Sequence, residues 1–254
     1  MKRAMLGKAG TAVFLAALTT ACGAPAAPQR IETPGATASG WTRPPAILSV
    51  QSTSANLIFT GMAEPGARVV LRNDSGAAYA AAADGRGRFE IRMTAPAGDL
   101  WLRPETQVGQ DAAPSPDRLL IVAGGRGPIV LLRSGGPTLR LDQAPALGAV
   151  DSDGRMRLAS GRAAGPAPVV VSAGGESVSV TPDAAGRWSL MLRPAGGPDE
   201  IEAGGSRFVW PGEAGNGEAG PGASSRIERA GQGWRVAWTG AGGARQTTWL
   251  PDAA

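Results

Sequence analysis

The sequence predicts an all-β protein made of two tandem β-sandwich modules, and three observations lead to this prediction. From Ala46 onward, short alternating apolar runs are separated by Gly, Asp, Asn and Pro at a spacing of about ten residues. No run keeps the helical period over any length. The segment Gly61–Leu71, "GMAEPGARVVL", also returns in Gly161–Val171 as "GRAAGPAPVVV", which indicates an internal duplication.

The first residues of the chain have the features of an export signal. A positively charged segment containing Lys2, Arg3 and Lys8 precedes the apolar stretch "TAVFLAAL", which is shorter than a membrane span. The following "LTTAC" resembles the lipobox of bacterial lipoproteins, and it ends at Cys22, the only cysteine. The resemblance implies that residues 1–22 are a lipoprotein signal peptide and that Cys22 bears the lipid. A signal peptide cut nearby, or an uncleaved anchor, is the alternative, and each version predicts export.

Residues 23–45 are expected to form a flexible, disordered tether. They are rich in Pro, Ala, Gly and Thr and show no hydrophobic period, so they cannot bury a core of their own. Trp41 is their one large aromatic residue, and we expect it to dock on the following module. Gly23 stands where some lipoproteins carry the aspartate that retains them at the inner membrane. We therefore expect a protein held to the membrane by its lipid in the bacterial cell envelope, at the outer membrane and facing the periplasm.

Charge and composition exclude several functional classes. The net charge of +4 falls by three, to +1, when Lys2, Arg3 and Lys8 leave with the signal peptide, and so near-neutral a chain predicts no nucleic-acid partner. The remaining chain has no histidine and no lysine, which excludes Ser-His-Asp and Ser-Lys catalysis, Schiff-base chemistry and histidine-ligated metals. A lipidated Cys22 leaves no thiol for a disulfide or a zinc site. We expect no cofactor and no metal.

The repeat extends over most of the chain after the tether. Residues 46–61 align without a gap on residues 146–161, and "DGRGRFEIRM" aligns on "DAAGRWSLML" after a slip of one residue. Further on, "WLRP" aligns on "FVWP", and each leads through a long loop into an expected hairpin, "RLLIVAGGRGPIVLL" or "RIERAGQGWRVAWTG". The shared order predicts two copies of one module. Their expected boundaries are residues 46–143 and residues 144–254.

Each copy contains an alternating strand with an aromatic anchor. Phe89 in "RFEIRM" and Trp188 in "RWSLML" are expected to point into a core, with the arginine before each one pointing outward. The preceding turn has an aspartate, Asp84 or Asp183, whose side chain can cap its own backbone. The glycine three residues after each aspartate can supply a positive φ.

The pattern G-x-A-x-P-G-A-x-V-x-L, followed by A-D-x-x-G-R-F-x-I, resembles bacterial immunoglobulin-like repeats. It also resembles the related carboxypeptidase-regulatory-like modules of transthyretin type. The resemblance covers Gly61 to about Pro104, and the second copy departs from it because its turn reads Gly165-Pro166, the reverse of the first. It implies Ig-like β-sandwiches used as spacer, stalk or adhesive units. Such families have no catalytic residues to carry over, and the hairpin after each long loop is outside the pattern.

Few residues remain as candidates for catalysis or metal binding. The acids Asp84, Glu90, Asp183 and Glu200 are expected on turns or outward strand faces, without the paired arrangement that glycoside hydrolysis needs. The segment Asp151–Gly154, "DSDG", opens like a calcium loop but lacks the later oxygen ligands, so we predict a hairpin turn. "GGRG" is also predicted to be a turn, because no helix follows that could bind a phosphate. We predict no catalytic residues and no enzyme.

A group of tryptophans near the C-terminus is the candidate binding feature. Trp234 and Trp238 share one face of an expected strand, Trp249 lies in the next strand, and Arg235 and Arg245 flank them. A hydrophobic core is the favoured interpretation, and an aromatic platform for a glycan or a protein is the rival. The sequence thus predicts a non-catalytic lipoprotein with a structural or protein-interaction role. The alternative is a carbohydrate- or peptidoglycan-binding lipoprotein that uses these five residues.

Overall fold

The computed structural model describes residues 42–53, 55–195, 197–213 and 225–252. The predictions for the signal peptide, for lipidation of Cys22, for Trp41 and for most of the tether lie outside these residues. Within them, no helix is long and apolar enough to cross a membrane.

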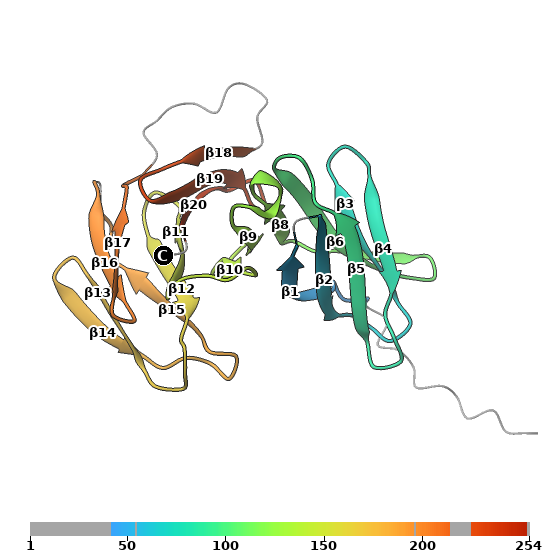
Figure 1. Ribbon diagram of the computed structural model, residues 1–254, viewed down its shortest axis with the longest axis horizontal. Helices are drawn as coiled ribbons and strands as arrows, with labels where there is room; N and C mark the ends of the chain where they lie inside the picture. The colour runs from blue at the N-terminus through green and yellow to red at the C-terminus, as the bar shows by residue number, and fades with distance from the viewer. Residues whose placement is uncertain (1–41, 54, 196, 214–224, 253–254) are drawn as a thin grey trace, which may run out of the picture. The chain divides into compact units, whose positions relative to one another are not determined.

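Two antiparallel sheets form the first sandwich (Figure 1). Sheet A has the strand order β1-β2-β5, and these strands are β1 (Ala46–Ser52), β2 (Asn56–Met62) and β5 (Arg88–Thr94). Sheet B has the order β10-β9-β8-β6-β3-β4, and β7 pairs with β6 as well. Its strands are β3 (Arg68–Asn73), β4 (Ala78–Ala82), β6 (Leu100–Val108), β7 (Asp111–Pro114), β8 (Arg118–Ile121), β9 (Ile129–Leu132) and β10 (Leu139–Arg140).

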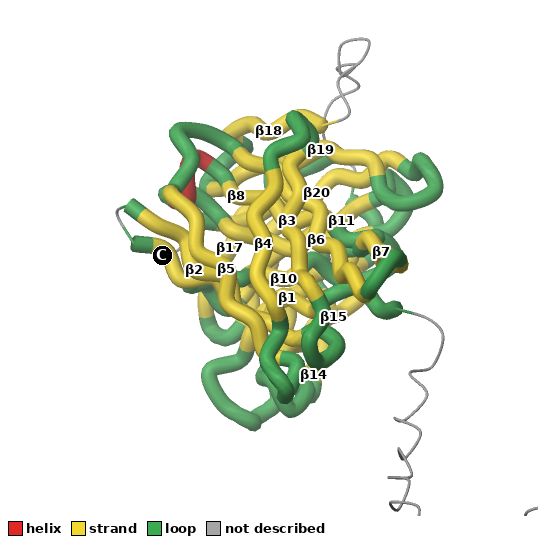
Figure 2. The backbone as a smooth tube through the Cα atoms, turned by 90° about the vertical axis from the view of Figure 1, so that its right-hand side faces the viewer, coloured by secondary structure: helices red, strands yellow, loops and turns green. Residues whose placement is uncertain are grey.

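Two further antiparallel sheets form the second sandwich. Sheet C has the order β15-β12-β11-β20-β19-β18, with β11 (Leu147–Ser152), β12 (Arg157–Arg162), β15 (Arg187–Leu192), β18 (Ser225–Arg229), β19 (Gly233–Thr239) and β20 (Arg245–Pro251). Sheet D has the order β14-β13-β16-β17, with β13 (Val169–Ala173), β14 (Glu176–Val180), β16 (Asp199–Ala203) and β17 (Ser206–Trp210). Apart from the single 3-10 turn Ala123–Gly125, the described residues contain no helix (Figure 2). The all-β prediction is confirmed.

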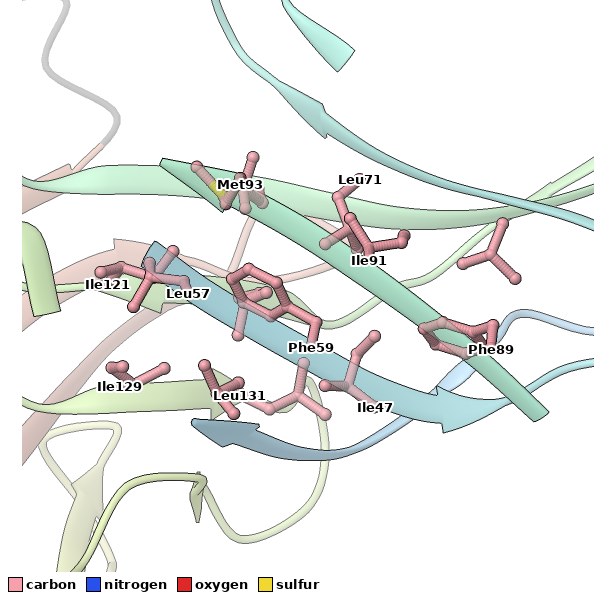
Figure 3. Close-up of a cluster of buried hydrophobic side chains, with 14 of the residues drawn as sticks. Ile47, Leu57, Phe59, Leu71, Phe89, Ile91, Met93, Ile121, Ile129 and Leu131 are labelled. Atoms are coloured by element: carbon pink, nitrogen blue, oxygen red, sulfur yellow. The ribbon is translucent and has the colours of Figure 1, made fainter. Parts of the chain in front are cut away.

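The core of the first sandwich lies between sheets A and B and follows from the alternation of their strands. Phe89, Ile91 and Met93 of β5 are buried, whereas Arg88 and Glu90 are exposed, as predicted. Figure 3 shows these side chains in one cluster with apolar residues from strands of both sheets. Its other buried members include Ile47, Leu57, Phe59, Leu71, Leu119, Ile121, Ile129 and Leu131.

The core of the second sandwich lies between sheets C and D and has the same origin. Trp188 and Leu192 of β15 are buried and Leu190 packs against them, so the aromatic anchor of this strand also points inward, as predicted. The cluster includes Leu147, Val150, Val171, Ile201, Phe208, Trp210 and Trp249. Each sandwich therefore has its own apolar core between two sheets.

The two sandwiches repeat one local irregularity. β1 pairs with β2 through a register shift between Ile47 and Ser49. β11 pairs with β12 through a register shift at the same place, between Leu147 and Ala149. Such irregularities are specific features of a sheet, so their shared position supports the duplication that the sequence indicates.

A glycine makes room for the aromatic anchor in each copy. Gly61 is the cross-strand partner of Phe89, and Gly161 is the partner of Trp188. A Cβ atom at Gly161 would overlap the carbonyl oxygen of Ala146 and would lie 2.7 Å from Cζ2 of the indole. The repeated glycine is therefore required because an aromatic ring packs directly on the backbone of the neighbouring strand.

The turn before each anchor strand forms as predicted. Asp84 Oδ1 accepts the backbone N–H groups of Arg86 and Arg88, each at 2.8 Å. These bonds, that from Arg88 first, hold the pKa of Asp84 below its ordinary value. Asp183 makes the same two bonds in the second copy. The glycine that follows each aspartate has a positive φ, 78° in the first copy and 74° in the second.

The copies diverge after their shared strands, and here the sequence alignment is wrong by one strand. β3 pairs with β6, and β13 pairs with β16, so the strand with "WLRP" corresponds to β16 and not to "FVWP" in β17. Both expected hairpins form, but β8–β9 extends sheet B whereas β18–β19 extends sheet C. The alignment followed shared aromatic and proline letters, whereas equivalence in a sheet is set by hydrogen-bonded neighbours.

Strands β8 and β9 are buried on both faces. Leu119 and Ile121 belong to the core of the first sandwich, whereas Leu120 and Val122 belong to a separate cluster. This cluster, here named the junction core, combines residues of sheet B with residues of sheet C. Its buried members are Leu120, Val122, Val130, Leu132, Ala149, Val236, Trp238 and Leu250, and the partly buried Trp101, Ala123, Ile227 and Trp234 pack against them.

Candidate functional site

The candidate tryptophans are divided between two cores. Trp234 and Trp238 of β19 belong to the junction core, whereas Trp249 of β20 belongs to the core of the second sandwich. Trp238 is 4% exposed and Trp249 is 1% exposed. Both indole N–H groups donate inside the protein, Trp238 Nε1 to Thr248 Oγ1 at 3.2 Å and Trp249 Nε1 to the Ala230 carbonyl oxygen at 3.0 Å. Neither ring therefore offers an open face to a ligand.

The two candidate arginines do not form one patch with these rings. Arg235 Nη1 lies 3.2 Å from Glu228 Oε1, and its Nη2 donates to a backbone carbonyl oxygen at 3.0 Å. Arg245 is exposed at the start of β20. Trp234 is half-buried, and the guanidinium of Arg229 lies over its ring at 4.9 Å from the centroid. Of the three tryptophans, Trp234 is the one that is partly exposed, and Arg229 covers its ring.

A half-buried carboxylate, that of Asp151, ties the two sandwiches together beside the junction core. Asp151 of β11 accepts hydrogen bonds from the backbone N–H of Thr138 at 2.8 Å, from Thr138 Oγ1 at 2.7 Å and from Thr248 Oγ1 at 2.7 Å. Burial raises the pKa of Asp151, and these donors partly oppose the rise. Thr138 directly precedes β10 of sheet B, so the carboxylate links sheet B to sheet C.

The "DSDG" segment forms the predicted hairpin turn. Asp153 Oδ1 accepts the backbone N–H groups of Arg155 and Met156, each at 2.9 Å. Asp151 lies two residues earlier in β11 and bonds to Thr138, so the two carboxylates serve different neighbours. Within the ranges that the structure describes, no group of three or more acidic, histidine or cysteine side chains could hold a metal ion.

The four candidate acids belong to separate elements, and each has an arginine partner. The nitrogen–oxygen distances are 3.4 Å for Asp84–Arg88, 2.6 Å for Glu90–Arg92, 3.3 Å for Asp183–Arg187 and 3.1 Å for Glu200–Arg207. These carboxylates are mainly exposed. Each acid thus forms an ion pair within its own turn, strand or hairpin, and the four do not come together in one acidic site.

A cavity of about 1000 Å³ lies between the two sandwiches. Its walls come from the start of β1, from the segment between β9 and β11, and from β12 and β15. Arg133, Arg140 and Arg187 line it, and each is paired with a nearby aspartate. Arg162 also lines it and is exposed, and it belongs to none of the ion pairs among the described residues. The buried indole N–H of Trp188, another lining residue, has no hydrogen-bond partner.

Sequence reasoning missed two arginines that hold the arrangement together. Arg140 donates to the carbonyl oxygen of Pro251 at 2.9 Å and pairs in a two-bond fork with Asp142, at 2.7 and 2.6 Å. Arg157 is buried in the second sandwich, and its Nη2 lies 2.8 Å from Asp199 Oδ2. The one available signal for Arg157 was its position on the inward face of an alternating strand.

Comparison with family models and with curated proteins finds no match. Among solved structures, the chain is similar to one described as "Central Fibronectin-III array of RIM-binding protein". The identity is 14%, the TM-score is 0.27, and the match covers 80% of this chain and 74% of the other. A likeness at this TM-score supports no conclusion about fold or function, so both depend on the strands and contacts of the chain itself.

Proposed function

We propose that the chain is a lipid-anchored protein of the bacterial cell envelope with a structural or protein-interaction role and no catalytic activity. The anchor is Cys22 at the end of "LTTAC", and the expected site is the outer membrane, facing the periplasm. The observation that supports a structural role best is the junction core, because its apolar side chains join two sandwiches into one body.

A joined body suits a scaffold better than a chain of independent modules. Domains that meet through small polar interfaces normally move relative to one another. Here Trp238 and seven buried aliphatic side chains share one apolar cluster, and the bonds between Thr138 and Asp151 fix its edge. Such a body holds its surfaces at a constant spacing, which is what a structural or adaptor protein requires.

No observation favours the alternative role in binding glycans through the tryptophans. A sugar-binding platform needs exposed ring faces, and Trp238 and Trp249 are closed within two different cores. Arg235, which could have contacted a ligand, is bonded to Glu228. We therefore keep the proposal to contacts with other proteins of the envelope.

Metabolic labelling with an alkyne fatty acid tests the anchor. We expect label and membrane retention for the wild type, and loss of both for Cys22→Ala. The variant Thr19→Leu is a matched control, because it changes a neighbouring position and keeps the cysteine. A wild-type protein that carries no label and fractionates as a soluble protein would exclude the proposed anchor.

A further inference from the structure

The first sandwich has a free strand edge at the place where the second sandwich has a strand. β11 of sheet C lies between β12 and β20, and its counterpart β1 is an edge strand that, among the described residues, pairs only with β2. In β11 the residues paired with β20 are Val150, Asp151 and Ser152, opposite Trp249, Thr248 and Thr247. Their counterparts in the first copy are Val50, Gln51 and Ser52. The open position beside Val50, Gln51 and Ser52 therefore corresponds to the position that β20 occupies in the second sandwich.

Exposure along β1 agrees with a vacant neighbouring position. Gln51 and Ser52 are exposed, whereas Asp151 is half-buried and Ser152 is 6% exposed. Leu48, earlier in β1, is 55% exposed. The difference between the copies is what removal of one covering strand would produce.

β1 lacks the charged side chains and the prolines that protect other open edges. Its register irregularity between Ile47 and Ser49 does not block pairing further along, because β11 has the same irregularity and still pairs with β20 at Val150–Ser152. The β1 sequence "AILSVQS" has no charged residue and no proline, whereas the edge strands β5, β14, β15, β17 and β18 each carry arginine or glutamate. β4 is an uncharged edge as well, but its counterpart β14 is also an edge strand. Among the described strands, β1 alone thus combines an edge without charge or proline with a counterpart that is paired on both sides.

The cavity between the sandwiches begins beside this edge. Ala46, Ile47 and Leu48 form part of its wall, and Leu131 and Leu139 add further apolar side chains to the lining. A chain that paired with β1 antiparallel, as β20 pairs with β11, would run from Ser52 towards Ala46 and so into the cavity. There it would approach the arginine side chains, including Arg162, that line the walls.

We propose that the free edge of β1 binds an extended segment of a partner protein as an added antiparallel strand. This inference rests on the proposed interaction role. The segment places an apolar residue opposite Val50, where β20 places Trp249 opposite Val150, and a polar residue opposite Gln51. An acidic residue two to four positions later in the segment meets the arginines of the cavity. Its carboxylate would give Arg162 an acidic partner.

A partner segment fits the edge better than the chain's own tether or a second copy. Residues 23–45 contain Pro25, Pro28 and Pro34, and each proline removes a ladder donor. A second copy would have to bring a whole sandwich against the edge, whereas walls from both sandwiches flank the cavity beside Ala46–Leu48. An extended chain occupies less space.

Disulfide trapping with a peptide of known sequence tests the proposal, with oxidised glutathione in the buffer as the two-electron acceptor. The probe has the sequence of Arg245–Asp252, "RQTTWLPD", with cysteine in place of Thr248, and the full chain carries Gln51→Cys. In the register of β20 these two cysteines lie directly opposite one another. We expect the mixed disulfide at Gln51→Cys to form at least about tenfold faster than with Ala80→Cys on β4, the matched uncharged edge. A second probe, with the cysteine moved to the position of Trp249, should also react more slowly, because its side chain faces inward.

Each other outcome overturns the proposal in a distinct way. Equal rates at Gln51→Cys and Ala80→Cys, or no preference between the two probes, would mean that the edge accepts no strand in register. Trapping that appears only after removal of residues 24–40 would assign the edge to the chain's own tether. A disulfide between two copies that outpaces the peptide would assign it to a second copy. Trapping in the Cys22→Ala background separates this proposal from the anchor, since the peptide should still react if only the anchor is lost.

Discussion

Truncation of Trp238 should weaken the contact between the two sandwiches so that they no longer unfold together. The side chain is 4% exposed in the junction core, and a tryptophan buries roughly 150–250 Å². At about 25 cal/mol per Å² the buried area corresponds to about 4–6 kcal/mol, and measured Trp→Ala costs of about 3–5 kcal/mol agree with this. The variant also loses the hydrogen bond from Trp238 Nε1 to Thr248 Oγ1, which contributes about 1 kcal/mol. We expect Trp238→Ala to lower the free energy of unfolding by about 3–5 kcal/mol.

The distribution of this loss distinguishes the junction core from an ordinary core. Trp249→Ala is the matched control. It removes the same type of side chain from the neighbouring strand β20, but from the core of the second sandwich instead of the junction core. In Trp238→Ala, hydrogen exchange should accelerate in β8 and β9 as well as in β19 and β20, and denaturant unfolding should change from one transition to two. In Trp249→Ala, β8 and β9 should keep their protection. A loss below about 1 kcal/mol, or faster exchange confined to β19 and β20, would refute the junction.

Three further predictions follow from the packing and charges described above. Gly161→Ala should destabilise by about 1–3 kcal/mol in thermal unfolding, because the new Cβ meets backbone, whereas Gly165→Ala, with open space around it, should be near neutral. Arg157→Met should cost about 3–5 kcal/mol in denaturant unfolding by leaving Asp199 without its partner, and an additional Asp199→Asn should recover part of the loss. The pKa of Asp151 is raised by burial, so its contribution to stability is full below about pH 4 and is lost as the pH rises through the folded pKa. Asp151→Asn should flatten this part of the stability–pH curve, and an unchanged curve would contradict the assignment.

The alternating patterns were sufficient to predict the class, the anchor strands and the turns. Phe89 and Trp188 occupy inward positions because strand periodicity alone fixes their face, and Asp84 caps its turn through bonds to residues close in sequence. The sheet membership of the two hairpins could not be predicted, since strand pairing depends on distant neighbours. The junction core could not be predicted for the same reason. A continuous apolar run such as "RLLIV" indicates a strand buried on both faces, but it does not show which sheets cover those faces.

The sequence also gives no indication of the hydrogen bonds between Thr138 and Asp151. Thr138 lies in a segment without periodicity, and nothing in "GGPTLR" indicates that a threonine there meets a carboxylate of the next sandwich. Arg157 could not be assigned from the sequence either. A charged residue is seldom buried without a partner, and the strand pattern does not show that Asp199 supplies one. Long-range polar contacts of this kind are set by the assembled fold.

The position of β1 has a mechanical consequence. If the chain is held at the membrane, tension reaches the first described strand at Ala46, and within the described part of the chain this strand is bonded to one neighbour only. Pulling there would load the β1–β2 ladder from one end, whereas the last strand, β20, is held on both sides by β11 and β19. A segment bound along the free edge of β1 would add a second ladder of hydrogen bonds to this strand. The force needed to pull β1 out of the sheet would therefore increase when the segment is bound.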